Sequence, residues 1–343
     1  MAQEYLRFVV VGAGHMGLNH IKKINSTEDR IGARVSVVVE PDELRATALA
    51  REFAGQGKNI KFISNLGQLN QVGATDYPDA AIVAVPASIH VETAAACLTQ
   101  GLHTLVEKPL GFSALDCRDL EQKSVASKKI VHVGLLERWS LQSLWSDWRP
   151  KVGPWTINSV RSGPFVPRAA DTDVIHDLMI HDIDLFVLLD SVFQFAPVTK
   201  VRAWGRKLRS GLIDYAIVAL DMEDGGMARF FASRLSADSH RNWEMTGPDW
   251  HASIDFMRRS LKRFERVGRD MNAFEAKEKA WIAGDPLGLE IEAFIRSIRG
   301  DTSALLKEHE DFCPLSKLLP TPQNVLRTHE IIDEVLSCIQ LLS

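Results

Sequence analysis

The sequence predicts an α/β protein with a parallel sheet in its first half and a mainly antiparallel sheet in its second. Three observations lead to this fold class. Short β-branched runs alternate with helical stretches up to about residue 138, a glycine-rich turn follows the first run, and the alternation stops after about residue 150. Apolar runs that alternate with helices are typical of a parallel sheet covered on both faces.

The elements of the first half follow from local signals. Pro41 and Asp42 begin the second helix, Ser88 is the expected N-cap of the third, and Gly101 closes it. A weaker strand and a short polar helix are expected between residues 55 and 79. The predicted strands are 7–12, 34–40, 60–64, 80–86, 103–109 and 130–138, and the main helices are 16–25, 41–54, 88–101 and 113–129.

The second half contains a hairpin meander and two helices. Residues 223–226, Glu-Asp-Gly-Gly, form the expected turn between two strands, which indicates an antiparallel sheet. The basic stretch 258–269 has its positive residues spaced by apolar ones, which favours one solvated helix face over a phosphate-binding patch. The predicted strands are 155–165, 199–209, 213–222 and 227–236, and the predicted helices are 174–190 and 321–342.

The chain is long enough for two domains. Its 343 residues exceed the roughly 250–300 at which single cores stop growing. We expect a dinucleotide-binding Rossmann domain over residues 1–138 and an α+β domain over 139–343, with the last helix able to pack back on the first domain. One face of the second sheet has a covering helix, and aromatic residues on its strands predict a homodimer or homotetramer through the other face.

Composition and charge limit the classes of function that the chain can have. The net charge is −4, and no dense run of Lys and Arg predicts a nucleic-acid partner. The N-terminus lacks the layout of a signal peptide, and the apolar stretches are shorter than the roughly 20 residues of a membrane span. No membrane partner and a cytoplasmic location are therefore expected. Four scattered cysteines without a C-x-x-C pair argue against a zinc site and a disulfide framework.

A glycine-rich turn joins the first predicted strand to the first helix. Gly12, Gly14 and Gly17 form a G-x-G-x-x-G motif in the context that dinucleotide binding requires. Gly12 permits the sharp turn, Gly14 lets backbone approach a pyrophosphate, and Gly17 lets the helix pack close to the strand. The helix N-terminus favours phosphate charge. A strand–helix turn without a ligand is the alternative.

Glu40 ends the second predicted strand, roughly 20 residues past the glycines. An acid there accepts hydrogen bonds from the adenosine ribose and repels a 2′-phosphate. No arginine follows at once, although Arg45 lies one helical turn on. These residues favour NAD over NADP. An ordinary strand-end acid would leave the cofactor preference open.

The segment 105–110, Leu-Val-Glu-Lys-Pro-Leu, places Lys108 at the end of a predicted parallel strand. Open α/β sheets bind ligands at this edge, and a lysine is costly to bury without a partner or a task. Glu107 is one candidate partner, and Pro109 fixes the backbone after Lys108 and can adopt the cis form. Taken alone, a strand-end lysine is more often a plain surface residue.

Together, these segments resemble the glucose–fructose oxidoreductase/inositol dehydrogenase family (Gfo/Idh/MocA). The likeness rests on the glycine turn, on residues 85–110, which contain Glu-Lys-Pro at 107–109, and on 177–185, Asp-Leu-Met-Ile-His-Asp-Ile-Asp-Leu. It runs nearly end to end: 242–256 is similar to the family's strand–Gly–strand passage, and 285–301 to its late helix. The Glu-Lys-Pro triplet is the most specific of these motifs.

The resemblance implies the residues of a cofactor and catalytic site. Lys108 corresponds to the active-site lysine, and Pro86 and His90 flank the cofactor. Arg138 stands where relatives often have an Asn-Arg or Glu-Arg pair near the nicotinamide, although Trp139 and Ser140 depart from the commoner residues. The expected cofactor contacts are Gly12, Gly14, His15, Met16, Gly17, Glu40, Pro86, His90, Glu107, Lys108 and Arg138.

Asp177 and His181 lie four residues apart on a predicted helix and therefore share a face. Apolar neighbours indicate that this face points inward, and a histidine paired with an acid is suited to proton transfer. The family's D-x-x-x-H pattern matches both residues. Alternatively, Asp177 is a helix N-terminal acid and His181 a core histidine. A metal site of His176, His181, Asp182 and Asp184 is disfavoured because i, i+5 histidines do not converge, so no metal is expected.

The implied reaction is hydride transfer between nicotinamide and a secondary alcohol or ketone of a sugar, nucleotide sugar or cyclic polyol. His181, oriented by Asp177, takes the hydroxyl proton, and Lys108 hydrogen-bonds the same oxygen; these roles can be exchanged. Residues 177–185 are most similar to members that oxidise the 3-hydroxyl of UDP-N-acetylglucosamine. Arg161 and Arg168 are either ligands for a phosphate or carboxylate, or surface positives.

Two other functions remain open at this point. The first is a reductase of an unsaturated or imine substrate on the same scaffold. His181 counts against it, because such enzymes can dispense with the helix histidine. The second is a sensor that binds the cofactor without catalysis. The presence of Lys108, Asp177 and His181 together counts against the sensor.

Overall fold

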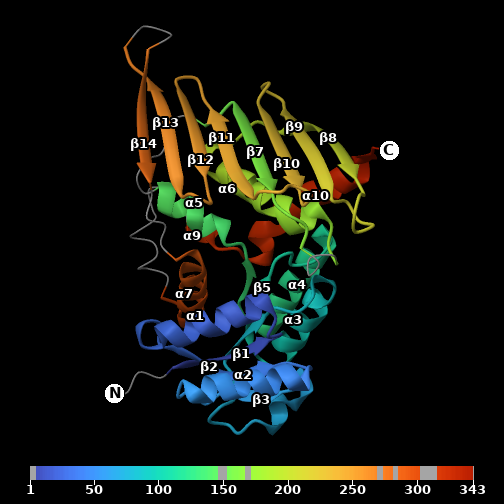
Figure 1. The fold of residues 1–343 in the computed structure, drawn as a ribbon, viewed down its shortest axis with the longest axis vertical. Coiled ribbons are helices and arrows are strands. Elements are labelled where there is room, and N and C mark those ends of the chain that lie inside the picture. Colours follow the sequence, from blue (N-terminus) through green and yellow to red (C-terminus); the bar gives the residue numbers. More distant parts are fainter. Residues whose placement is uncertain are drawn as a thin grey trace. The chain divides into compact units, whose positions relative to one another are not determined.

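The computed structural model describes residues 5–145, 153–166, 171–268, 273–280, 285–301 and 315–342. Contacts within the chain divide it into two compact units. The first unit joins residues 1–136 to the later segments 285–308 and 319–326, and the second comprises 137–284, 309–318 and 327–343. Each unit is described by itself below (Figure 1).

The first unit is built on a parallel sheet of six strands in the order β3-β2-β1-β4-β5-β6. This is the order of dinucleotide-binding doubly wound folds. The order in which strands are added to the sheet reverses between β1 and β4, although the two strands are parallel. The strands are β1 Leu6–Val11, β2 Ala33–Val39, β3 Lys61–Ile63, β4 Ala80–Val83, β5 His103–Glu107 and β6 Val131–Gly134. The helices are α1 His15–Ile31, α2 Glu43–Gly55, α3 His90–Thr99, α4 Ala114–Ser127 and α7 Pro286–Arg299, with 3₁₀ turns η1 Leu66–Gln71 and η2 Ala87–Ile89.

Both faces of this sheet are buried, which explains why its strands read as unbroken apolar runs. Val9 and Val11 of β1 pack into one hydrophobic cluster, whereas Phe8 and Val10 pack into another. Alternate residues of a strand point to opposite faces, so the two clusters lie on the two sides of the sheet. Phe294 of α7 belongs to the second cluster, where α7 packs beside α1.

One predicted helix start is confirmed and one is wrong. The Asp42 side chain accepts a hydrogen bond from the Arg45 backbone N–H and caps α2. The prediction that Ser88 caps α3 is wrong, because Ser88 lies inside η2 and α3 begins only at His90. The backbone makes one tighter turn before the α-helix, and such 3₁₀ turns are frequent at helix N-termini.

The second unit contains a sheet of nine strands in the order β14-β13-β12-β11-β7-β10-β9-β8-β15. Neighbours pair antiparallel except β7 with β10 and β8 with β15. The strands are β7 Thr156–Ser162, β8 Val198–Arg206, β9 Tyr215–Met222, β10 Met227–Ser233, β11 His240–Thr246, β12 Trp250–Asp255, β13 Ser260–Arg266, β14 Phe274–Ala280 and β15 Gln340–Leu341. The fold class predicted from the sequence is confirmed.

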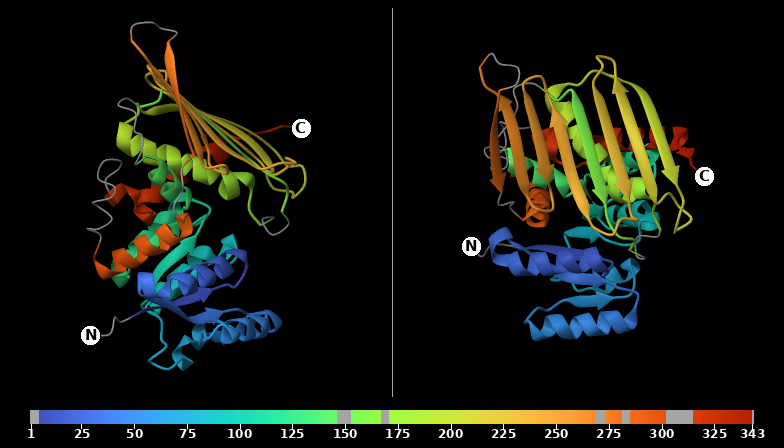
Figure 2. Two further views of the ribbon diagram at one scale, coloured as in Figure 1. Left: turned by 60° about the vertical axis from the view of Figure 1, so that its left-hand side comes forward. Right: turned by 45° about the horizontal axis from the view of Figure 1, so that its top comes forward.

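Helices cover one face of this second sheet (Figure 2). They are α5 Glu137–Trp145, the π-helical turn η4 Ile175–Met179, α6 Ile180–Phe193, α9 Leu315–Leu318 and α10 Pro322–Cys338. Phe230 points to this covered face, where it is buried against Phe186 at a ring-centroid distance of 6.0 Å. Among the described elements, no helix covers the opposite face.

The basic stretch 258–269 is a strand and not the helix that its spacing predicted. Residues Ser260–Arg266 form β13, which pairs with β12 and β14. Asp255 initiates the preceding turn by accepting backbone N–H groups from Met257 and Arg258, and Arg259 follows in the left-handed region with φ 56°. The turn therefore sends the chain back along β12, and cross-strand pairing overrides the charge pattern.

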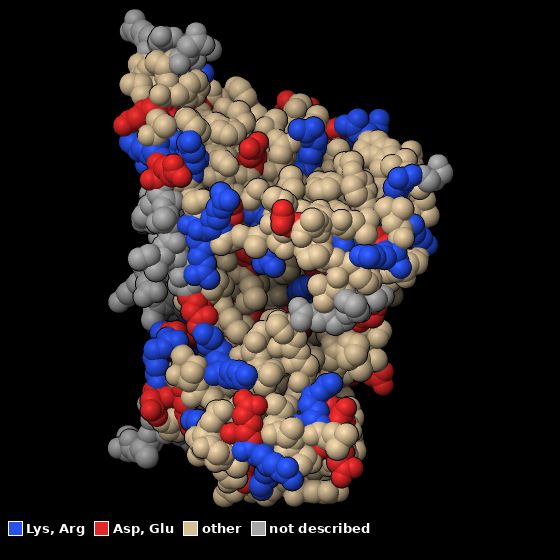
Figure 3. Space-filling view, in the orientation of Figure 1, with Lys and Arg blue, Asp and Glu red and all other residues tan. Residues whose placement is uncertain are grey.

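The surface mixes charges of both signs, in keeping with the small net charge (Figure 3). On the face shown, lysines and arginines alternate with acidic residues over both units. Within the described part of the chain, no helix combines the length and apolar character that crossing a membrane demands.

Candidate active site

The glycine turn is held by very close backbone packing in the first unit. A Cβ on Gly17 would lie 1.8 Å from the Gly12 carbonyl oxygen, and one on Gly12 would lie 2.5 Å from that of Ala84. Gly12 also has φ 92°, in the region that favours glycine. Any side chain at either position would move α1 or the loop after β4, so both glycines are required by the fold.

Gly14 is different, because a Cβ built on it meets nothing within 4 Å. It is the N-cap of α1, carries no capping side chain, and is followed by a first turn without acidic residues. The space beside Gly14, at the N-terminus of α1, is thus open. Helix N-termini of this kind bind anions, so the residues present fit the pyrophosphate of a dinucleotide. His15, which follows, is exposed, and Met16 is half-buried.

The Glu40 carboxylate is fixed beside the glycine turn. It is 4% exposed, and its Oε1 accepts the Asp42 backbone N–H at 2.9 Å while Oε2 accepts that of Ala13 at 3.2 Å. Arg45 places Nη1 3.4 Å from Oε2. The acid therefore lies where the sequence predicted, with a half-exposed arginine beside it.

Lys108 follows the end of β5, and the Lys108–Pro109 peptide bond is cis. His90 holds this segment in place, because its Nδ1 lies 2.6 Å from the Pro109 carbonyl oxygen and its Nε2 lies 2.9 Å from that of Val85. The histidine thus ties the loop after β4 to the loop after β5. Its ring is buried, which makes it a support for Lys108; direct cofactor contact by His90 stays a prediction.

Two other predicted cofactor residues differ in exposure. Pro86 lies at the exposed start of η2, at the carboxyl end of β4. Glu107 is buried instead, and its Oε1 lies 2.7 Å from His20 Nε2. Contact of the Glu107 carboxylate with a cofactor therefore has no support from this geometry.

In the second unit, Asp177 and His181 lie on a helix that begins with a π-turn. The Ile180 backbone N–H donates to the Ile175 carbonyl, five residues earlier. Asp173 precedes this turn and accepts the backbone N–H groups of Ile175 and His176. Single π-turns inserted in helices occur frequently at functional sites.

Exposure separates these two residues from their neighbours. Asp177 and His181 are half-buried, whereas Ile175, Met179 and Ile180 are fully buried. The sequence predicted an inward-facing pair, and the structure shows a pair that stays accessible on an otherwise buried segment. This combination lets the pair meet a substrate while the rest of the helix stabilises the unit.

Asp182 and Asp184, the remaining acids of the segment, are engaged in the interior. Asp182 accepts bonds from Arg161 at 2.9 and 3.1 Å and from Trp243 Nε1 at 2.8 Å. Asp184 accepts two from Arg138, at 2.6 and 2.7 Å. Buried acids held by arginine forks are structural pairs, because the desolvation cost is offset only by such bidentate geometry.

Two arginines consequently have roles that the sequence did not predict. Arg138 also donates to the carbonyls of Lys317 and Leu318 and is 1% exposed, so its contact with the cofactor stays a prediction without geometric support. Arg161 is 3% exposed and also bonds Glu137, so a surface position is wrong. The carboxylates raise the pKa of Arg161 above its ordinary value although burial opposes them. Arg168 lies outside the described residues.

Sequence reasoning missed the pair of Asp173 and His176. His176 Nδ1 lies 2.7 Å from Asp173 Oδ2, and these hydrogen bonds lower the pKa of Asp173, although burial opposes the shift. The available signal was an acid one position before the helical stretch, the ordinary place of a helix cap. The Arg161 and Arg138 pairs gave no such signal, since their partners lie 21 and 46 residues away.

We predict that Gly17 is required for folding, whereas Gly14 is required for dinucleotide binding. Gly17→Ala should destabilise or unfold the protein, because its Cβ has no room. Gly14→Ala should leave the melting temperature within a few degrees and weaken dinucleotide binding by about tenfold or more, roughly 1.4 kcal/mol. Thermal denaturation and calorimetric titration measure the two effects. A Gly14→Ala protein that melts like Gly17→Ala would contradict the assignment of open space at Gly14.

Comparisons with known proteins agree with this geometry. Residues 6–135 match the family model GFO_IDH_MocA, described as an oxidoreductase family with an NAD-binding Rossmann fold. UDP-N-acetylglucosamine 3-dehydrogenase of Acidithiobacillus ferrooxidans is 28% identical over 299 residues, which cover 86% of this chain and 89% of that protein. Inositol 2-dehydrogenase of Corynebacterium glutamicum is 29% identical over 230 residues, or 64% of each chain.

Solved structures show the same fold. That of the Acidithiobacillus ferrooxidans UDP-N-acetylglucosamine 3-dehydrogenase superimposes with a TM-score of 0.79 at 24% identity, covering 98% of this chain and 97% of its own. A 3-ketoreductase from Actinomadura kijaniata, solved with TDP-benzene and NADP, gives 0.74 at 16% identity, covering 98% and 99%. The glycine turn, the strand order and the family match lead to one conclusion: residues 6–135 form an NAD-binding Rossmann domain of the Gfo/Idh/MocA oxidoreductase family.

Proposed function

We propose that this oxidoreductase transfers a hydride between NAD and a secondary alcohol or ketone of a nucleotide sugar, with a sugar or cyclic polyol as related substrates. The observation that carries the proposal is the accessible pair of Asp177 and His181 on a buried helix that begins with a π-turn. The UDP-N-acetylglucosamine 3-dehydrogenase of Acidithiobacillus ferrooxidans matches over 86% of this chain, which favours a nucleotide sugar.

The proposed chemistry assigns one task to each side chain. When bound, the nicotinamide accepts the hydride from the alcohol carbon. His181 takes the hydroxyl proton, and Asp177 orients the ring and stabilises its protonated form. Lys108 donates a hydrogen bond to the same oxygen, which stabilises the negative charge that develops there. In the direction of reduction, the same groups return the proton.

We expect Lys108 and His181 to affect turnover far more than cofactor binding. Lys108→Ala and His181→Ala should each lower kcat by about 10²–10⁴-fold, the usual contribution of a general acid or base. NAD affinity should change by less than about tenfold, because Gly14 and Glu40 hold the cofactor elsewhere in the first unit. The double variant should lose less than the product of the single effects, because groups that act together are not additive.

The assay follows the absorbance of reduced cofactor with UDP-N-acetylglucosamine, myo-inositol and related sugars. Asp177→Asn should lose less activity than His181→Ala, because Asp177 only orients its neighbour. If His181→Ala keeps full turnover but melts at a lower temperature, His181 is a core residue and the proposed base is wrong. If no alcohol in the panel is oxidised and no ketone reduced, the substrate class is wrong.

Glu40 is proposed to select NAD over NADP. Glu40→Gln keeps the size of the side chain and removes the charge, so it should relieve repulsion of a 2′-phosphate and narrow the ratio of NAD to NADP affinity by about tenfold. Arg45 is then available to the phosphate. Glu43→Gln, an exposed acid of α2, is the control and should leave the ratio unchanged. A preference for NADP in the unmodified protein would overturn the assignment.

The uncovered sheet face is proposed to join copies of the chain into a homodimer or homotetramer. Strand register places Val160, Phe231, Ile217 and Trp204 side by side across β7, β10, β9 and β8. Tyr215 extends this row, with its ring 5.1 Å from that of Phe231. Phe230 does not contribute, because it faces the helices. A continuous apolar row on an open sheet is typical of an interface.

Light scattering at micromolar concentration tests this assembly. The unmodified protein should be a dimer or a tetramer, and Phe231→Glu should dissociate it by placing a charge in the row. Leu44→Glu, on the exposed side of α2, is the matched control and should not change the mass. A monomeric unmodified protein would contradict the proposal that this sheet face joins copies of the chain.

A further inference from the structure

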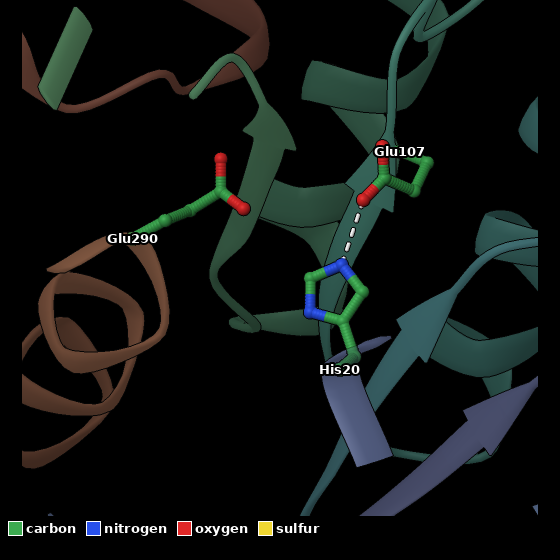
Figure 4. A group of neighbouring side chains, drawn as sticks. All are labelled: His20, Glu107 and Glu290. Carbon is green, nitrogen blue, oxygen red and sulfur yellow. Dashed lines mark hydrogen bonds and ion pairs between the residues drawn. The ribbon is translucent and has the colours of Figure 1, made fainter. Parts of the chain in front are cut away.

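Three buried side chains converge inside the first unit from three separate elements (Figure 4). His20 comes from α1, Glu107 ends β5, and Glu290 comes from α7. The exposed fractions of His20 and Glu290 are 0%, and that of Glu107 is 6%. Potential ligand atoms of the three residues all lie within 4.8 Å of one another. Polar side chains are rarely gathered so deeply without a function or a bound partner.

The hydrogen bonds of this cluster are incomplete. Between the three residues there is one contact, from His20 Nε2 to Glu107 Oε1 at 2.7 Å. His20 Nδ1 and both carboxylate oxygens of Glu290 are buried without a hydrogen-bond partner among the described residues. Figure 4 shows the Glu290 side chain extending from its helix toward the other two. Two unsatisfied carboxylate oxygens beside the contact of His20 and Glu107 indicate a missing water or ion.

Charge distinguishes an ion from a water. Two buried carboxylates this close repel each other when both are charged. A water would satisfy hydrogen bonds and leave the negative charge in place. A proton on Glu290 would remove the charge, but no acceptor lies within hydrogen-bond distance of either oxygen among the described residues. A cation meets both requirements.

We propose that His20, Glu107 and Glu290 form a buried site for one divalent transition-metal ion. An ion bound by all three residues takes the lone pair of His20 Nε2 in place of the hydrogen bond to Glu107, because Nδ1 lies on the opposite side of the ring. The ligand atoms lie within 4.8 Å of one another, so small movements of the side chains would bring them to metal–ligand bonds of about 2.0–2.2 Å. One divalent ion neutralises the two carboxylates, and the nitrogen ligand favours Zn²⁺ over Mg²⁺ or Ca²⁺, which prefer oxygen ligands alone.

The expected effect of the metal is to fasten α7 to α1 and β5. Lys108 follows Glu107 directly, so the same ion would also stiffen the backbone that carries the catalytic lysine. The ion takes no part in the proposed hydride transfer, and the tests below therefore do not depend on the substrate or on activity.

The experiment measures metal content and thermal stability together. Protein dialysed against a chelator is incubated with Zn²⁺, Mn²⁺ or Mg²⁺, desalted and analysed by mass spectrometry for metal. We expect one equivalent of Zn²⁺ per chain and a higher melting temperature with Zn²⁺ than with Mg²⁺. Glu290→Gln should weaken Zn²⁺ affinity by more than the roughly 10–100-fold that losing a hydrogen-bond partner of a ligand costs.

Glu292→Gln is the matched control, because Glu292 lies on the same helix and pairs with Arg30 and Arg296 instead. This variant should bind Zn²⁺ like the unmodified protein. The proposal is overturned if the unmodified protein binds no metal and gains no stability. It is also overturned if Glu290→Gln binds equally well, since the ion then lies elsewhere.

A third outcome identifies a proton in place of the metal. Burial together with Glu107 raises the pKa of Glu290, so neutral Glu290 would contribute stability below the ordinary glutamate pKa. This contribution would be lost as the pH rises through the pKa in the folded protein. If the unmodified protein lacks metal and loses stability with rising pH relative to Glu290→Gln, a buried proton fills the cluster and the metal proposal is rejected.

Discussion

The close approach of α1 to the turn that follows β1 is the constraint on which the first unit depends. Only a hydrogen atom fits at Gly17, where a Cβ would meet the Gly12 carbonyl oxygen at 1.8 Å. This packing fixes the direction of α1, whose N-terminus has open space beside Gly14. The same direction places His20, one turn further along, on the inner side of the helix against Glu107. A single steric requirement thus sets both the phosphate end and the buried polar cluster.

The second unit is organised by buried pairs of arginine and aspartate. Arg161 with Asp182 and Arg138 with Asp184 fasten α6 to its surroundings. Removing one partner from such a pair typically costs about 3–5 kcal/mol, because the other charge is left buried and unpaired. Asp177 is not part of these forks and stays half-buried. The interior acids therefore support the helix, and its accessible residues are available for chemistry.

The two sheets show why local pattern predicts one kind of element better than another. Strands of the first unit are buried on both faces, so their valine runs were unambiguous, and β1, β2 and β4 lie where the sequence placed them. The charge spacing of residues 258–269 predicts a helix face, because half-exposed strands with long charged side chains have no such apolar run. Pairing with β12 and β14 decided the outcome, and pairing is a property of distant residues.

The sequence by itself determined the parts of this protein whose chemistry is local. Four features each lie within a short stretch, so residue type and spacing are enough to recognise them. They are the glycine turn, the acid at Glu40, the Glu-Lys-Pro segment and the one-face spacing of Asp177 and His181. Tertiary structure alone decided what is buried and with which partner. Arg138 became an interior anchor and His90 a clamp on the Pro109 carbonyl. His20, Glu107 and Glu290 met from α1, β5 and α7, because burial and pairing are set by chain segments that only the fold brings together.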